Sequence, residues 1–76
     1  MNLARIRRWA KDDRQIVANV HLILSGADKS MAEMARIMGI SARTLYQRLK
    51  RPDTFTVREL RILDWVADLH GIKTER

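Results

Sequence analysis

Residues 30–50 read SMAEMARIMGISARTLYQRLK, and this stretch decides the fold. It predicts two short helices joined by a sharp turn. Ser30 and Glu33 form a capping box, in which the serine oxygen accepts from the N–H three residues on and the glutamate reaches back to the serine N–H. Gly39 is expected to end the first helix, because glycine adopts the left-handed backbone conformation without a steric penalty.

The second of these helices is predicted to be amphipathic. Ser41 is a good N-cap for it, and Pro52 prevents it from continuing much beyond residue 51. At about 100° of rotation per residue, Leu45 and Leu49 lie on one side. A different side carries three polar residues: Arg43, Gln47 and Lys50. One side is therefore expected to pack against the core and the other to face outward.

Two further helices flank this pair. The first begins at residues 12–13. It is expected to end at Gly26, because glycine readily adopts the left-handed conformation that terminates many helices. The second begins at a capping box formed by Thr56 and Glu59, and it ends near residues 70–71. No run alternates with a two-residue period for long enough to indicate a strand. The sequence therefore predicts an all-α fold, a compact bundle of four to five short helices.

Positive charge is concentrated in two segments. The 76 residues include 15 Lys and Arg against 9 Asp and Glu, which gives a formal net charge of +6. Residues 41–51 hold four of these cations and no acid, and residues 1–14 hold five cations against two acids. This balance favours polyanionic partners: nucleic acid, an anionic membrane surface or an acidic protein.

Composition argues against several other classes. The chain has no cysteine, and His21 and His70 lack a further ligand at metal-binding spacing, so neither a metal nor a cofactor is expected. The acids have no partner arranged for acid–base or nucleophilic chemistry, and we expect neither an enzyme nor a small-molecule ligand. The longest apolar run, residues 20–24 with His21 interrupting it, is far too short to span a membrane, and no signal peptide is recognised. A cytoplasmic location is expected.

The helix pair has the pattern of a helix-turn-helix. Ala35 is small where the two helices would cross, Gly39 suits the turn, and Ile40 suits its corner. On these residues, the segment 31–50 resembles the helix-turn-helix of the phage repressor and Cro family, the Xre-type DNA-binding domains. The resemblance extends more loosely over residues 16–72, with one helix before the pair and another after it. It implies a sequence-specific, double-stranded DNA-binding transcriptional regulator, a phage-type repressor in a bacterial host cell.

The resemblance also implies which residues contact DNA. It places the N-terminal part of the helix 42–50 in the major groove, where arginine can bind guanine, glutamine can bind adenine and an alanine methyl can touch thymine. The predicted base-reading residues are Ala42, Arg43, Tyr46 and Gln47. The predicted phosphate contacts are Lys29, Ser30, Ser41, Lys50 and Arg51. For Tyr46, shielding of the core edge is an open alternative, and for Ser41 capping alone is another.

Two polar features outside this face have simpler interpretations. Arg48 points away from Arg43, so we expect it either in solvent or paired with an acid elsewhere in the fold. Asp64 and Asp68 lie one helical turn apart and are expected on an exposed face together with Arg61.

Residues 1–11 form a basic segment ahead of the helix-turn-helix domain at 12–76. Two interpretations are open for it. Its arginines form an arm that contacts DNA, or the segment packs as an extra helix through Leu3, Ile6 and Trp9, which we favour. The arm interpretation rests on three residues: Arg5, Arg7 and Arg8.

A homodimer is expected, because one helix reads only about five base pairs. The last helix carries a wide apolar arc, and its candidate dimer contacts are Ile62, Trp65 and Leu69. Alternatively, Trp65 packs under the N-terminal segment of its own chain. Two other functions compete with a regulator: a small helix-turn-helix scaffold that binds or inhibits a host protein, and the targeting domain of a recombination or replication complex.

Overall fold

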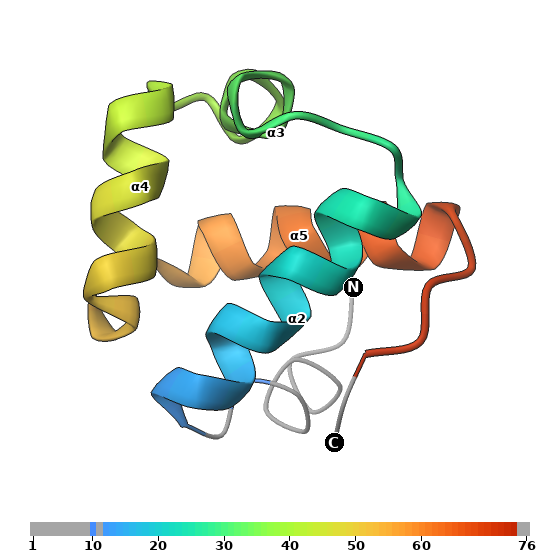
Figure 1. Ribbon diagram of the computed structural model, residues 1–76, viewed down its shortest axis with the longest axis horizontal. Coiled ribbons are helices and arrows are strands. Elements are labelled where there is room, and N and C mark those ends of the chain that lie inside the picture. Colours follow the sequence, from blue (N-terminus) through green and yellow to red (C-terminus); the bar gives the residue numbers. More distant parts are fainter. Residues whose placement is uncertain (1–9, 11, 75–76) are drawn as a thin grey trace.

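The computed structural model describes residue 10 and residues 12–74, and all the regular structure in them is helical. In this part of the chain four α-helices follow one another: α2 (Asp13–Gly26), α3 (Met31–Met38), α4 (Ala42–Lys50) and α5 (Val57–Leu69). A short 3₁₀ turn, η1 (Pro52–Thr54), joins α4 to α5. In Figure 1, α4 runs along one edge, α3 lies end-on near its start, and α2 crosses in front of α5. The all-α prediction is confirmed for the described residues.

Each predicted helix start is capped by the expected side chain. Asp12 accepts a hydrogen bond from the Gln15 N–H at 2.9 Å, and so it, rather than Asp13, caps α2. Both capping boxes are present, at the starts of α3 and α5. Such caps satisfy backbone N–H groups that have no partner inside a helix, and each is worth about 1 kcal/mol. The positions of the helices therefore follow directly from the sequence.

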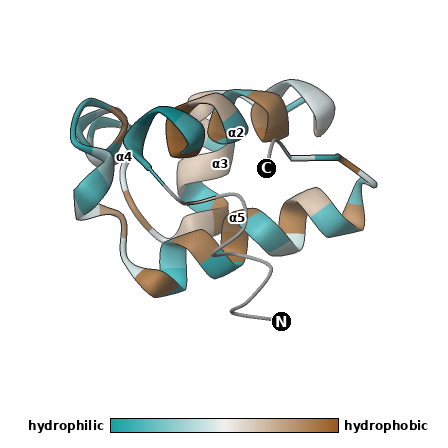
Figure 2. Ribbon diagram, turned by 90° about the horizontal axis from the view of Figure 1, so that it is seen from below, coloured by the Kyte–Doolittle hydropathy of each residue, from teal (hydrophilic) through white to brown (hydrophobic). Residues whose placement is uncertain are grey.

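The core lies where the four helices meet. Its fully buried side chains come from all four of them: Val20, Ile23, Met34, Met38, Leu45 and Leu63. Pro52 and Phe55, from the connection between α4 and α5, are also buried. Figure 2 shows polar and apolar residues interleaved along α5, as expected of a helix with one buried side. Among the methionines of α3, Met34 and Met38 are buried in the core and Met31 packs against it.

A tight turn joins α3 to α4. Gly39 has a φ of 76°, in the left-handed region, and the Ile40 N–H donates to the Ala35 carbonyl at 2.9 Å. Ile40 is half-buried and packs against the core, and Ala35 is buried. The predicted left-handed turn at Gly39 is confirmed. The turn brings the start of α4 directly against the end of α3.

The prediction for Gly26 was right about where the helix ends and wrong about the backbone conformation. It is the last residue of α2, and the left-handed residue in the following turn is Asp28, with a φ of 53°. A Cβ on Gly26 would lie 2.7 Å from Cγ1 of Ile72. The glycine therefore makes room for the segment that follows α5, a contact between residues far apart in the sequence.

The prediction for Asp64 was also wrong. Its side chain lies at the border of the buried side of α5 and only 3% of the residue is exposed, whereas Asp68 is exposed as predicted. The buried side of α5 is wide because both α2 and α3 pack on it. The opposite side of α5 carries Arg58, Arg61, Trp65 and Leu69, all exposed.

Candidate nucleic-acid interface

The outer face of α4 is a continuous polar surface. Arg43, Gln47 and Lys50 are all exposed, while Leu45 on the opposite side of the same helix is fully buried and Leu49 is half-buried. Tyr46 is 56% exposed, so it does not shield the core edge, and it lies beside the three polar residues. Four residues named from the sequence thus share one open side of one helix.

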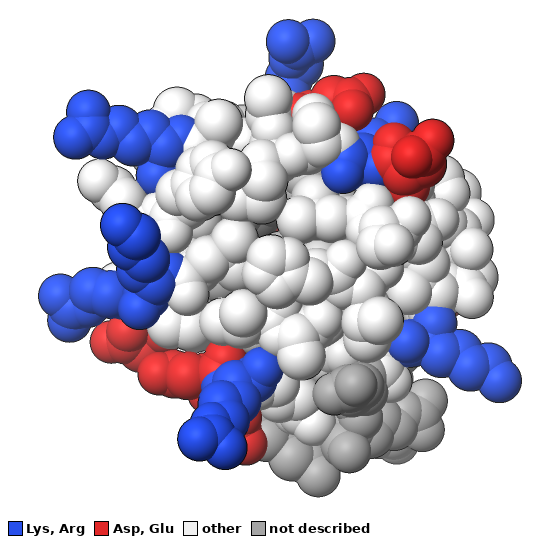
Figure 3. Space-filling view, in the orientation of Figure 1, with Lys and Arg blue, Asp and Glu red and all other residues white. Residues whose placement is uncertain are grey.

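Charge on this side of the molecule is mainly positive. Figure 3 shows Lys and Arg side chains projecting from the edge of the molecule where α4 lies, and acidic side chains next to them at the start of α2. The centre of the face shown carries no charged side chain. Because no acid lies within residues 41–51, every charged residue on the outer face of α4 itself is a cation.

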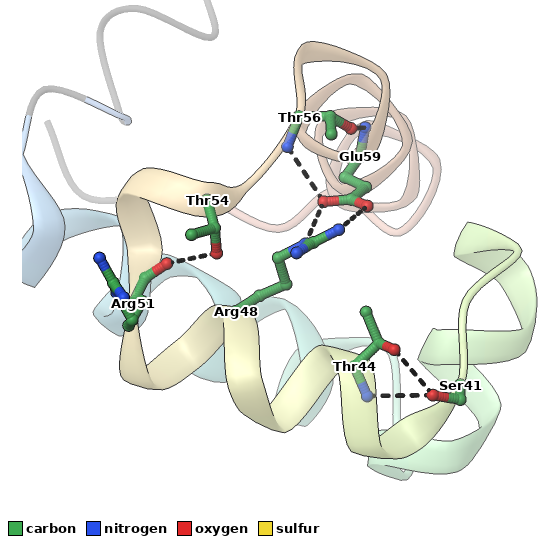
Figure 4. Close-up of polar contacts among 7 residues, drawn as sticks. All are labelled: Ser41, Thr44, Arg48, Arg51, Thr54, Thr56 and Glu59. Carbon is green, nitrogen blue, oxygen red and sulfur yellow. Dashed lines mark hydrogen bonds and ion pairs between the residues drawn. The ribbon is translucent and has the colours of Figure 1, made fainter.

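The start of α4 is organised by Ser41. Its Oγ accepts from the Thr44 N–H at 3.0 Å and shares a hydrogen bond with the Thr44 hydroxyl at 2.8 Å (Figure 4). Ser41 is exposed, so it combines the expected capping role with access to solvent. Ala42 is half-buried and packs against the core, which sets it apart from the exposed base-reading candidates.

The start of α3 is less suited to phosphate than the sequence implied. The Ser30 hydroxyl accepts from the Glu33 N–H, and the Ser30 N–H donates to Glu33 Oε1 at 3.0 Å. Hydrogen bonds from Ser30 to the Glu33 carboxylate, the backbone N–H first and then the side chain, lower the pKa of Glu33, so a carboxylate occupies this helix start at neutral pH. Lys29 beside it is half-buried. Lys29 and Ser30 are therefore weaker phosphate candidates than Lys50 and Arg51.

The end of α4 carries the two exposed cations Lys50 and Arg51. The Arg51 N–H donates to the carbonyls of Gln47 and Arg48, at 3.0 and 3.1 Å, which closes the last turn of the helix. Cations at this end of a helix are favoured by the partial negative charge of its free carbonyls. Both side chains remain available to an anionic partner.

Arg48 is not in solvent but is paired with an acid, which was the second of its two predicted places. Its Nε donates to Glu59 Oε1 at 3.0 Å and its Nη2 donates to Oε2 at 3.3 Å (Figure 4). Glu59 Oε1 also accepts from the Thr56 N–H at 3.0 Å. One buried carboxylate thus caps α5 and holds α4 at the same time.

The electrostatics of Glu59 follow from these contacts. Burial raises the pKa of its carboxyl group, but the hydrogen bonds from the Arg48 side chain and the Thr56 backbone together outweigh burial, and the net effect is a lowered pKa. Glu59 is therefore ionised at neutral pH. Its charge compensates that of Arg48, so Arg48 adds less to the cationic surface than Arg43, Lys50 or Arg51.

Arg58 is a candidate that sequence reasoning missed. It is exposed, and its two terminal nitrogens would lie 3.7 Å from a Cβ placed on Gly39. A cation from the start of α5 therefore lies beside the turn between α3 and α4. Only the packing of α5 against α3 shows this, because Arg58 is 19 residues away from Gly39 in the sequence.

The remaining candidates fall into two groups. Arg5, Arg7 and Arg8 lie outside the described residues, as does the basic segment 1–11 except for residue 10. Of the proposed dimer contacts, Trp65 and Leu69 are 50% and 65% exposed, whereas Ile62 is half-buried and packs against the core.

Within residue 10 and residues 12–74, no group of three or more His, Cys, Asp or Glu residues is arranged to hold a metal ion. No helix there is long and apolar enough to cross a membrane. Comparison with protein-family models, with curated proteins and with solved structures gave no match to this chain.

Proposed function

We propose that this protein is a sequence-specific, double-stranded DNA-binding regulator that places α4 in the major groove. The observation that carries the proposal is the division of α4 into a buried side at Leu45 and an open, cationic side. An α-helix fits the width of the major groove, and Arg43 and Gln47 lie one turn apart, as needed to read neighbouring base pairs.

The proposal assigns α3, the turn at Gly39 and α4 to a helix-turn-helix. Support comes from the short turn, from the small Ala35 between the two helices and from the close packing of α3 on α4. In such a motif the first helix lies across the DNA backbone while the second reads base edges. Lys50, Arg51 and Arg58 then contact phosphates on either side of the groove.

The proposal includes a homodimer on a two-fold site, with half-sites about 34 Å apart. A single helix covers too few base pairs for a unique site, so two copies are needed for useful specificity. The exposed Trp65 and Leu69 on the outer side of α5 are the candidate contacts. Large exposed apolar side chains of this kind are typical of interaction surfaces.

Selection of bound duplexes from a random pool tests the proposed function. We expect enrichment of a two-fold symmetric sequence whose half-sites are read by Arg43 and Gln47. The matched control is Arg43→Ala with Gln47→Ala, which should enrich no sequence while still retaining duplex DNA at low salt. If the wild-type protein enriches no sequence and retains no duplex, the regulator proposal fails, and a protein partner becomes the better account of the surface of α4.

A further inference from the structure

An open hollow lies at the corner between α4 and η1. Its volume is about 360 Å³, and it is lined by Gln47, Arg48, Lys50, Arg51 and Thr54. Three of these five residues are cations and none is an acid. Most of the lining surface is apolar, because the aliphatic stems of the long side chains form the walls. The hollow thus combines an aliphatic floor with charged groups.

The backbone around the hollow is fixed by its own hydrogen bonds. The Thr54 hydroxyl donates to the Arg51 carbonyl at 2.6 Å, and the Thr54 N–H donates to the same oxygen at 2.9 Å (Figure 4). Pro52 restricts the backbone between them and is itself buried. The corner therefore keeps its shape without a ligand, which lowers the entropic cost of binding one.

Arg48 is held in a defined orientation at this hollow. The Nε and Nη2 groups of Arg48 donate to Glu59, while Nη1 of the same guanidinium makes no hydrogen bond within the described part of the chain. A guanidinium fixed on one edge presents its remaining donors in a set direction. Arg48 thus pairs with Glu59 while its side chain also lines the hollow.

We propose that this hollow receives one deoxyribose-phosphate unit of a DNA backbone. The inference rests on the proposed function and adds a specific backbone subsite to it. The phosphate meets Arg48 Nη1, Lys50 and Arg51, while the sugar lies on the aliphatic walls. A bare phosphate leaves much of the 360 Å³ unfilled, and an uncharged apolar ligand would cover Lys50 and Arg51 without a compensating charge.

This subsite fixes how α4 sits in the groove. Gln47 lines the hollow and also belongs to the outer face of α4, so the backbone unit and the bases are contacted from adjacent positions. A phosphate anchored at the end of the helix sets the register of Gln47, and through it of Arg43, against the bases.

Blocking the hollow without changing charge tests the proposal. Thr54 is exposed, so Thr54→Tyr can place an aromatic ring in the hollow while the core stays intact. Thr54→Val is the matched control, because it also loses the bond to the Arg51 carbonyl but leaves the hollow open. We expect Thr54→Tyr to weaken binding to a random duplex about tenfold, as for the loss of one charged hydrogen bond, and Thr54→Val to weaken it less than about twofold.

The outcomes separate this inference from the proposed function. Equal duplex affinity of the two Thr54 variants overturns the subsite and leaves DNA binding intact. Absence of duplex binding by the wild-type protein at low salt overturns the proposed function and the subsite with it.

A second measurement on the wild-type protein does not depend on how the variants fold. Titration of ¹⁵N-labelled protein with deoxyribose 5-phosphate should give saturable amide shifts at Lys50, Arg51 and Thr54, larger than those caused by inorganic phosphate. Shifts of similar size at Lys73, an exposed cation in the segment after α5, would overturn the inference.

Discussion

Arg48 on α4 and Glu59 on α5 form a two-pronged ion pair, with Nε 3.0 Å from Oε1 and Nη2 3.3 Å from Oε2. The residues are 11 positions apart, and the 3₁₀ turn η1 lies between them. The same carboxylate completes the capping box of α5. The pair therefore fixes the candidate DNA-reading helix against the last helix of the bundle.

The first prediction concerns this pair and pH. The pKa of Glu59 is lower in the folded protein than its ordinary value of 4.5, so its ionised form stabilises the fold. That contribution is complete above about pH 4.5 and is lost as the pH falls through the lowered folded-state pKa. Glu59→Gln should lower the free energy of unfolding by about 1–3 kcal/mol at pH 7. It should also reduce the acid limb, which is the fall in that free energy as the pH drops below about 4.5. Urea unfolding between pH 2 and 7 measures both effects.

Glu33→Gln is the control for that experiment. Glu33 has a lowered pKa too, but it is exposed and lies at the start of α3, away from Arg48. Its substitution should leave most of the acid limb in place. An acid limb that is unchanged by Glu59→Gln would show that the pair contributes nothing to stability.

Base reading by Arg43 and Gln47 gives the second prediction. Arg43→Ala and Gln47→Ala should each cost about 1–3 kcal/mol on the selected duplex and little on a random one. Fluorescence anisotropy with both duplexes measures the difference. Equal losses on the two duplexes would reassign these residues to phosphate contact.

Lys50 gives the third prediction, which concerns salt. Lys50→Ala should weaken binding to all duplexes alike and reduce the slope of log K against log salt by about 0.9, as for one released counterion. Lys73→Ala is the matched control, since Lys73 is an exposed cation in the segment after α5. It should leave the slope unchanged. Identical slopes for the two variants would argue against a phosphate contact at Lys50.

The two helix-associated glycines give the fourth prediction. Gly39→Ala should destabilise the fold by about 1–2 kcal/mol, because a Cβ is disfavoured at a φ of 76°. The space around it is not the cause, as the nearest atoms lie 3.7 Å away on Arg58. Gly26→Ala should destabilise the fold through a steric clash, because its Cβ would lie 2.7 Å from Cγ1 of Ile72. Shortening that neighbour with Ile72→Ala should therefore rescue Gly26→Ala and leave Gly39→Ala unrescued, in thermal unfolding.

The proposed dimer gives the fifth prediction. Trp65→Ala with Leu69→Ala should shift sedimentation from dimer to monomer without loss of helix content, since both side chains are largely exposed. Binding to a two-fold site should weaken accordingly. A wild-type protein that sediments as a monomer both alone and on its selected duplex would remove the dimer from the account.

Local features of the sequence predicted the fold well. An N-cap side chain accepts a hydrogen bond from the N–H three residues later, so a helix start can be recognised from local spacing. The caps at Ser30, Ser41 and Thr56 are therefore predictable from the sequence alone. The same holds for the turn at Gly39. The sequence also predicted that a helix ends at Gly26, but not the contact with Ile72 that requires a glycine there, because spacing carries no information about that contact.

The candidate site was predicted only where one helix defines it. The exposed side of α4 follows from helical periodicity, so Arg43, Tyr46 and Gln47 were placed on it together. The acid that pairs with Arg48, the position of Arg58 beside the turn and the burial of Asp64 all depend on how α5 packs. Those contacts join helices, and periodicity within one helix does not determine them.

The central claim is that the outer face of α4 is the surface that binds DNA. Amide shift mapping of ¹⁵N-labelled protein with a random duplex at low ionic strength tests it most directly. We predict that the largest shifts fall at residues 41–51 and at Arg58, and that they shrink as salt is added. Shifts confined to α2 or to the second half of α5, or no shifts at all in a folded sample, would contradict the account.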